Sequence, residues 1–213
     1  MFRNLLNPNN PLMVTFAQIG DCVFLSLFWV AGCFPIVTLG ASTAALYDAT
    51  YRSFRKGEKN SWQRFFYVFR NHLKAGILPS FVLMAAFTAL TWLLIRQWNN
   101  AVAGNLSWSV FSAFAFLGMI AFGVLSVMMP LLSRFETNAA TLLKNTVLLA
   151  LAHLPRTIAL GILNTVVLFL CAMYVFPLFF LPALAALIGS LFLEPMFKPY
   201  MPVIETVDDE AED

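Results

Sequence analysis

Charged residues are scarce in this chain. They make up 11% of its 213 residues, whereas hydrophobic residues make up 60%. Soluble domains contain about a quarter charged and about half apolar residues, so this composition excludes an ordinary soluble protein and indicates a single integral membrane domain over 1–200. Six of the eleven acidic residues lie after position 204. We therefore expect 201–213 to form an acidic, disordered cytoplasmic tail.

Catalytic motifs are also lacking. The sequence contains no GxSxG, HExxH or P-loop pattern and has only two histidines. The cysteines, Cys22, Cys33 and Cys171, are odd in number and lie in apolar segments without the paired spacing of a metal site. We therefore expect no enzyme activity, no cofactor and no metal site. The charges are segregated along the chain, which also argues against nucleic-acid binding.

Long apolar runs are what the sequence has instead, and they predict an all-α, polytopic membrane helical bundle. A helix that crosses a bilayer needs about 20 mostly apolar residues. About five transmembrane helices are expected, together with one or two cytoplasmic amphipathic helices at the interface. The predicted spans are 16–34, 75–95, 108–129, 157–176 and 183–197. Pro177 and Pro182 mark an external turn between the last two.

A helix break follows the first span. The expected break motif consists of Gly32, Pro35, Thr38, Gly40 and Ser42. Pro35 has no backbone N–H and disfavours a helical conformation at the residue before it, while the glycines loosen the backbone on either side. Thr38 or Ser42 can cap the helix that follows. The pattern therefore predicts one helix, a turn, and a second helix that runs into a basic region.

Three segments of the chain resemble a known family. They are LFW at 27–29, FPIVTLGASTAALY at 34–47 and FFYVFR at 65–70. These segments are similar to those of the YesL-like bacterial membrane proteins, a family of unknown molecular function. The resemblance implies a polytopic protein of the bacterial cytoplasmic membrane that is associated with carbohydrate uptake and breakdown.

A basic and aromatic helix is expected at 61–74, where Ser61 is a good N-cap. Its side chains at helical spacing are Trp62, Arg64, Phe65, Phe66, Phe69, Arg70 and Lys74. We expect the aromatic side to face the lipid bilayer and the basic side to face anionic headgroups. An anchor that sets the topology and a docking helix for a partner protein both fit this pattern.

The basic residues also predict the topology. With five spans and an external N-terminus, seven of them lie in the first cytoplasmic connection, three in the second and one near the C-terminus, which leaves Arg3 and Arg96 outside. The positive-inside rule favours this orientation strongly. We therefore expect a multi-pass protein of the cytoplasmic membrane with its N-terminus outside and its C-terminus in the cytoplasm.

Asp21 is the candidate intramembrane polar site, because it lies near the start of the first span. An ionisable residue there is either functional or in contact with headgroups. We expect a non-enzymatic accessory membrane protein, and the family resemblance implies a carbohydrate transporter permease subunit as its partner. The alternative is a membrane carrier of a small solute, a sugar or an oligosaccharide, since an interrupted helix exposes backbone groups to solutes.

Overall fold

The computed structural model describes residues 11–58, 60–104, 106–135 and 139–200, and over these ranges it contains helices and no strand. The all-α prediction is therefore confirmed. The α-helices are α2 (Pro11–Cys33), α3 (Leu39–Lys56), α4 (Ser61–Val102), α5 (Trp108–Arg134), α6 (Ala139–Ala152), α7 (Leu154–Met173) and α8 (Leu181–Phe197). Three 3-10 helices are η1 (Ile36–Thr38), η2 (Phe176–Phe179) and η3 (Lys198–Tyr200). The predicted tail 201–213 lies outside the described residues.

Four of the described helices are long and apolar enough to cross a membrane: α4, α5, α7 and α8 with η3. The chain is thus a protein with several membrane-span-like helices. The first predicted span falls on α2, an apolar helix of 23 residues whose part from Gln18 to Cys33 is shorter than the other four. The turn between α7 and α8 contains η2, which includes Pro177, and Pro182 lies in the first turn of α8.

Helix α4 differs from the prediction. The expected interfacial helix at 61–74 and the expected span at 75–95 form one continuous helix of 42 residues, about 63 Å long at 1.5 Å per residue. Pro79 lies inside this helix, although proline removes the hydrogen bond to the carbonyl four residues earlier and its ring crowds that carbonyl. Nothing between Lys74 and Ala75 ends the helix, so the amphipathic part continues directly into the apolar part.

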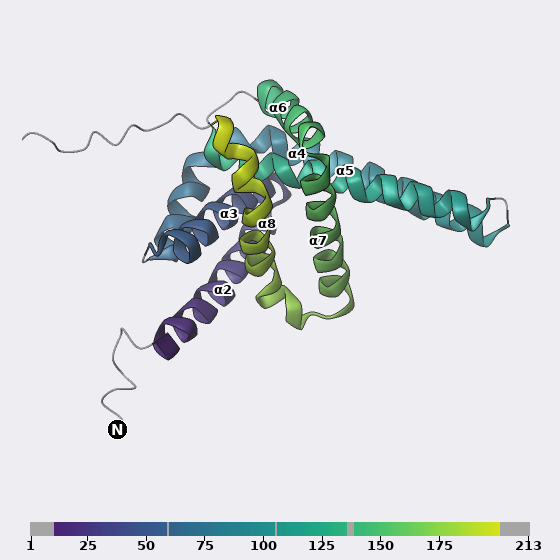
Figure 1. Ribbon diagram of the computed structural model, residues 1–213. Coiled ribbons are helices and arrows are strands. Elements are labelled where there is room, and N and C mark those ends of the chain that lie inside the picture. The colour runs from purple at the N-terminus through teal and green to yellow at the C-terminus, as the bar shows by residue number, and fades with distance from the viewer. Residues whose placement is uncertain (1–10, 59, 105, 136–138, 201–213) are drawn as a thin grey trace, which may run out of the picture.

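Helix α3 lies at the centre of the packed body, which also contains α2, α8, and the parts of α4 and α5 nearest to it (Figure 1). Every residue from Gly40 to Thr50 is buried except Thr43. One core cluster joins α3 to α5, α6, α7 and α8, and another joins it to α2 and the start of α4. This least apolar of the long helices is therefore the one that the others surround.

The second half of α4, from Phe81 onward, and the first part of α5, up to Val124, form a hairpin that we call the arm. The arm extends away from the body in a direction clearly different from that of α7 and α8 (Figure 1). Near its tip Trp98 packs edge-on against Trp108, with ring centroids 5.5 Å apart. The arm therefore presents most of its apolar surface to its surroundings.

The base of the arm is held by a close crossing of α5 and α7. A side chain at Gly123 would clash with the carbonyl oxygen of Thr157 and would lie 3.1 Å from the nitrogen of Gly161. A side chain at Gly161 would in turn lie 2.5 Å from the carbonyl oxygen of Met119. Small residues allow such contact between backbones in lipid.

We expect Gly123→Ala to lower the free energy of unfolding by about 1–3 kcal/mol, because backbone atoms of α7 cannot move aside as a side chain could. Gly118→Ala is the matched control on the same helix, since its new methyl group would meet only the Leu90 and Leu94 side chains at 3.5 Å. Alanine is favoured over glycine in a helix by about 1 kcal/mol, so this control should be neutral or stabilising. Thermal unfolding in detergent measures the stability of both variants. Equal melting temperatures for Gly123→Ala and Gly118→Ala would contradict a close backbone contact between α5 and α7 at Gly123.

Candidate functional site

The predicted helix break is found between α2 and α3, with η1 in the gap. Thr38 takes the N-cap position of α3, yet its side chain makes no cap hydrogen bond. Its hydroxyl donates instead to the carbonyl oxygens of Gly32 (2.6 Å) and Pro35 (2.8 Å). Thr38 therefore holds the turn together and does not cap the helix that follows it.

Ser80 of α4 provides the hydrogen-bond acceptor for a backbone N–H in the first turn of α3. The Gly40 N–H donates to the Ser80 hydroxyl oxygen at 2.7 Å, and that hydroxyl donates to the Gly76 carbonyl at 2.6 Å. A side chain at Gly40 would lie 2.5 Å from the Ser80 oxygen and 3.0 Å from the Gly76 oxygen. Gly40 is thus needed for close approach between α3 and α4, since its φ is not positive.

The remaining residues of the break motif join α2 to α3. The Ser42 hydroxyl donates to the Trp29 carbonyl at 3.1 Å, and the Trp29 indole N–H donates to the Thr43 hydroxyl at 3.2 Å. A side chain at Gly32 would lie 2.6 Å from the Ser42 oxygen. The motif therefore folds α3 back along α2. The contacts that these residues make hold the two helices together.

Asp21 is partly buried and contacts the other end of α3. Its carboxylate accepts a hydrogen bond from the Ser53 hydroxyl at 3.1 Å. Because Trp29 bonds to Thr43 and Asp21 bonds to Ser53, α3 runs antiparallel to α2 along most of its length. No ion pair to Asp21 is found in the part of the chain that the structure describes.

The basic and aromatic helix lies in the first part of α4, and only part of it faces outward. Trp62, Phe66, Arg70 and Lys74 are exposed. Phe65 is buried and Phe69 is partly buried, both packed in the core cluster with α2 and α3. The expected lipid-facing aromatic side is thus partly a helix–helix contact, because an apolar face fits a neighbouring helix as well as it fits lipid.

Among these residues, Arg64 differs most from the expectation that the basic side chains face anionic headgroups. Its Nε donates to an oxygen of Asp48 at 2.6 Å, and the Asp48 side chain is 1% exposed. Arg52, one turn after Asp48 on α3, donates to the other carboxylate oxygen at 3.2 Å. A third guanidinium, from Arg134 at the end of α5, lies 3.4 Å from that same oxygen. One buried carboxylate thus meets arginines from three helices.

Arg134 connects this carboxylate to a second one. Its terminal nitrogen donates to Glu194 of α8 at 2.5 Å, and its side chain is 10% exposed. The guanidinium also stacks on the Tyr51 ring at 4.3 Å from the centroid, a favourable cation–π geometry. We call Tyr47, Asp48, Arg52, Arg64, Arg134 and Glu194 the charge cluster. It joins α3, α4, α5 and α8.

Tyr47 completes the charge cluster as a hydrogen-bond donor. Its hydroxyl donates to Glu194 at 2.8 Å. Burial and the adjacent Glu194 carboxylate raise the pKa of the Tyr47 phenol well above its usual value. The phenol therefore stays protonated at neutral pH and remains a donor. Glu194 accepts hydrogen bonds from both Tyr47 and Arg134, which lie on different helices, and Arg134 balances its charge.

The charge cluster is suited to holding helix ends together and to binding an anion at its arginines. Within the described residues, no group of three histidine, cysteine, aspartate or glutamate side chains is arranged to hold a metal ion. Removing one member would leave an uncompensated buried charge, which costs much more than losing an exposed pair.

Sequence reasoning missed Tyr47, Asp48, Arg134 and Glu194 as a site. A weak signal was present, since only five acidic residues precede position 205. Acids that are rare in an apolar chain need cationic partners. Which arginine pairs with which acid was not recoverable, because Asp48 and Arg134 are 86 positions apart.

We expect Asp48→Asn to lower the free energy of unfolding by about 3–5 kcal/mol, the usual cost of breaking a buried ion pair. Glu58→Gln is the matched control, since Glu58 also pairs with Arg52 but its side chain is 43% exposed. An exposed pair contributes about 0–1 kcal/mol. Thermal unfolding of the purified variants in detergent separates the two cases. Similar melting temperatures for both variants would show that the charge cluster is dispensable.

Comparison with known proteins finds a match to a family of unknown function. The model of a family described as "Protein of unknown function, DUF624" matches residues 22–98. The match runs from α2 through most of α4 and so contains the break motif, Asp48 and Arg64. No curated protein matches the chain, and no solved structure matches it. The chain is thus similar, over that segment, to an uncharacterised family.

Proposed function

We propose that this chain is a non-enzymatic accessory membrane protein that binds a transmembrane helix of another membrane protein through its arm. The observation that carries the proposal is a shallow apolar groove of about 540 Å³ on α4. Its lining residues are Phe81, Met84, Ala85, Thr88, Ala89 and Trp92. They lie on one side of α4 at spacings of three and four residues, which makes a continuous stripe along the helix.

The groove has the form that helix association in lipid requires. Ala85 and Ala89 are four residues apart and make a low floor, while Phe81 and Trp92 stand at the two ends. Small residues four apart let a second helix approach closely, and the Thr88 hydroxyl offers an interhelical hydrogen bond. Only 11% of the most apolar stretch of α4 is buried, against 44% for α8. The apolar stretch of α4 is therefore the least buried of the four, since those of α5 and α7 are each 17% buried.

The charge cluster supports an accessory role over a catalytic one. Its carboxylates are paired with arginine, and its phenol is held as a donor to Glu194. Such pairing fixes the positions of helix ends. The partner class, a carbohydrate transporter permease, and the YesL-like designation rest on the resemblance of 27–29, 34–47 and 65–70 described above.

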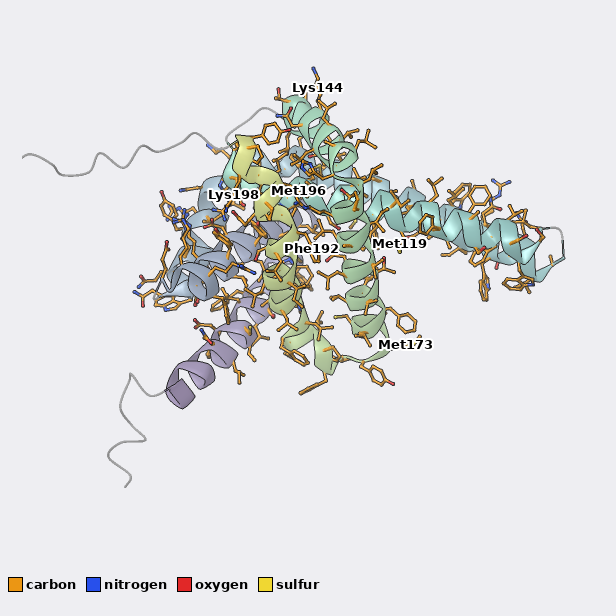
Figure 2. The ribbon with its side chains drawn as sticks, in the orientation of Figure 1. Met119, Lys144, Met173, Phe192, Met196 and Lys198 are labelled. Carbon is orange, nitrogen blue, oxygen red and sulfur yellow. The ribbon has the colours of Figure 1, made fainter. Side chains whose placement is uncertain are left out.

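The orientation is part of the proposal, with the N-terminus outside and the C-terminus in the cytoplasm. Figure 2 supports it: Lys144 and Lys198 lie toward one end of the molecule and Met173 lies at the other. The start of α2 points toward the same end as the α7–α8 turn (Figure 1). These two lysines thus lie at the end that the proposal, by the positive-inside rule, assigns to the cytoplasm.

Ala89→Leu should lower the yield of the heteromeric complex about tenfold. A larger side chain on the groove floor costs about 1–3 kcal/mol of packing, and 1.4 kcal/mol corresponds to a factor of ten. Ala172→Leu on the exposed surface of α7 is the matched control and should leave the yield unchanged. Crosslinking in native membranes followed by mass spectrometry measures the yield. Recovery of the chain only as a monomer or homo-oligomer would overturn the accessory function.

Cysteine labelling tests the orientation. In a variant without the native cysteines, a cysteine that replaces Phe179 should react with an impermeant thiol reagent in intact cells. A cysteine that replaces Lys144 should react only after the membrane is opened, because it lies on the basic side. Both positions are exposed. The reverse pattern would invert the topology.

A solute carrier is the second candidate, and one observation favours it. Asp48 and Arg134 form a buried ion pair within a chain of membrane-span-like helices, and buried ionisable groups in such proteins often mark ion or substrate paths. Uptake of sugars or oligosaccharides by the purified protein in vesicles would support the carrier. Absence of uptake across a panel of these solutes, with a heteromeric complex recovered from membranes, would support the accessory protein.

A further inference from the structure

A second groove lies between the first part of α4 and the end of α5, beside the charge cluster. It encloses about 590 Å³. Its polar lining comes from Arg64, Tyr67, Asn71 and His72 on α4 and from Ser133 and Arg134 on α5. Of the described residues that line it, none is acidic, whereas two are arginines. An anion is therefore the kind of ligand that this groove favours.

The two arginines keep donors that the charge cluster does not use. Arg64 donates to Asp48 through Nε, and none of the hydrogen bonds among the described residues uses its terminal nitrogens. Its side chain is 30% exposed, so these nitrogens are within reach of a ligand. The guanidinium is also oriented by the Tyr67 ring, 5.4 Å from its centroid. Arginine presents planar pairs of N–H groups that match phosphate oxygens.

Arg134 provides a second and stronger indication that the groove binds an anion. Its two terminal nitrogens bond to Asp48 and Glu194, but its Nε is buried and has no hydrogen-bond partner among the residues that the structure describes. A buried donor without an acceptor costs about 1–3 kcal/mol. The side chain that carries this donor is 90% buried and lines the groove. An acceptor oxygen from a bound anion would satisfy it.

We propose that this groove binds a phosphate group, and that the natural ligand is the phosphodiester of an anionic phospholipid. The remaining lining side chains are apolar: Val68, Ala75, Leu132 and Phe135. A ligand with a phosphate at one end and hydrocarbon at the other fits such a mixed lining. Arg70 and Lys74 are exposed on the same part of α4 and add positive charge nearby. A free phosphate compound shares the headgroup chemistry but not the hydrocarbon.

The phosphate site goes beyond the docking of a partner on the arm and does not depend on it. The docking groove lies at Phe81 to Trp92, whereas the phosphate groove ends at Ala75 on the same helix. A variant in one groove therefore leaves the other intact. Loss of phosphate binding with normal crosslinking, or the reverse, distinguishes the two proposals.

The obvious variants, at Arg64 and Arg134, also break the charge cluster, so the test uses Asn71→Asp. This change conserves the shape of an exposed side chain and places a negative charge in the groove, which repels an anion. Asn145→Asp on α6 is the matched control, with the same chemical change at an exposed position outside the groove. Unchanged melting temperatures without ligand show that both variants fold.

The assay is thermal unfolding and native mass spectrometry of the purified full chain in a neutral detergent. Dioleoyl phosphatidylglycerol, dioleoyl phosphatidylcholine and inorganic phosphate are added separately. We expect phosphatidylglycerol to bind and to raise the melting temperature, with an affinity about tenfold lower in Asn71→Asp and unchanged in Asn145→Asp. Stabilisation by inorganic phosphate with the same dependence on Asn71 would assign the site to a free phosphate compound. Equal effects of both lipids, or equal losses in both variants, would overturn the site.

Discussion

The structure depends on keeping the Asp48 carboxylate buried and paired. Asp48 lies on α3, the helix that the others surround, and it receives guanidinium groups from α3, α4 and α5. Burying a lone carboxylate is so costly that the side chain would otherwise be protonated or drawn to the surface. The start of α4, which carries Arg64, and the end of α5, which carries Arg134, must therefore meet at Asp48. Glu194 then fixes α8 to the same point through Arg134.

Features set by local chemistry could be predicted from the sequence. The break at Pro35, the helix after it and the α7–α8 turn follow from proline geometry and from the length of apolar runs. Features set by distant partners could not. Ser80 caps Gly40 from 40 positions away, and no periodicity within α4 indicates that its hydroxyl serves another helix. The same holds for Phe65, because an apolar face does not reveal whether lipid or α2 covers it.

The direction of the arm limits how the chain can lie in a bilayer. A flat bilayer has one normal, and transmembrane helices tilt from it by about 20° on average. The arm and the α7–α8 hairpin point in clearly different directions (Figure 1), so they cannot both cross a flat bilayer at such tilts in this arrangement. The crossing at Gly123 and Gly161 is where α5 meets α7 and where a change of angle would be resisted.

The order in which the charge cluster is synthesised has a consequence for biogenesis. Asp48 leaves the ribosome with Arg52 and Arg64 close behind, but Arg134 follows 86 positions later, and Glu194 comes 60 positions after that. At about 5–20 residues per second, the first of these delays is on the order of 10 s. During that interval α3 is a polar helix between apolar neighbours, and its carboxylate has two of its three arginines. The charge cluster can therefore be completed only after α8 has been translated, so the packed body closes late relative to the synthesis of α3.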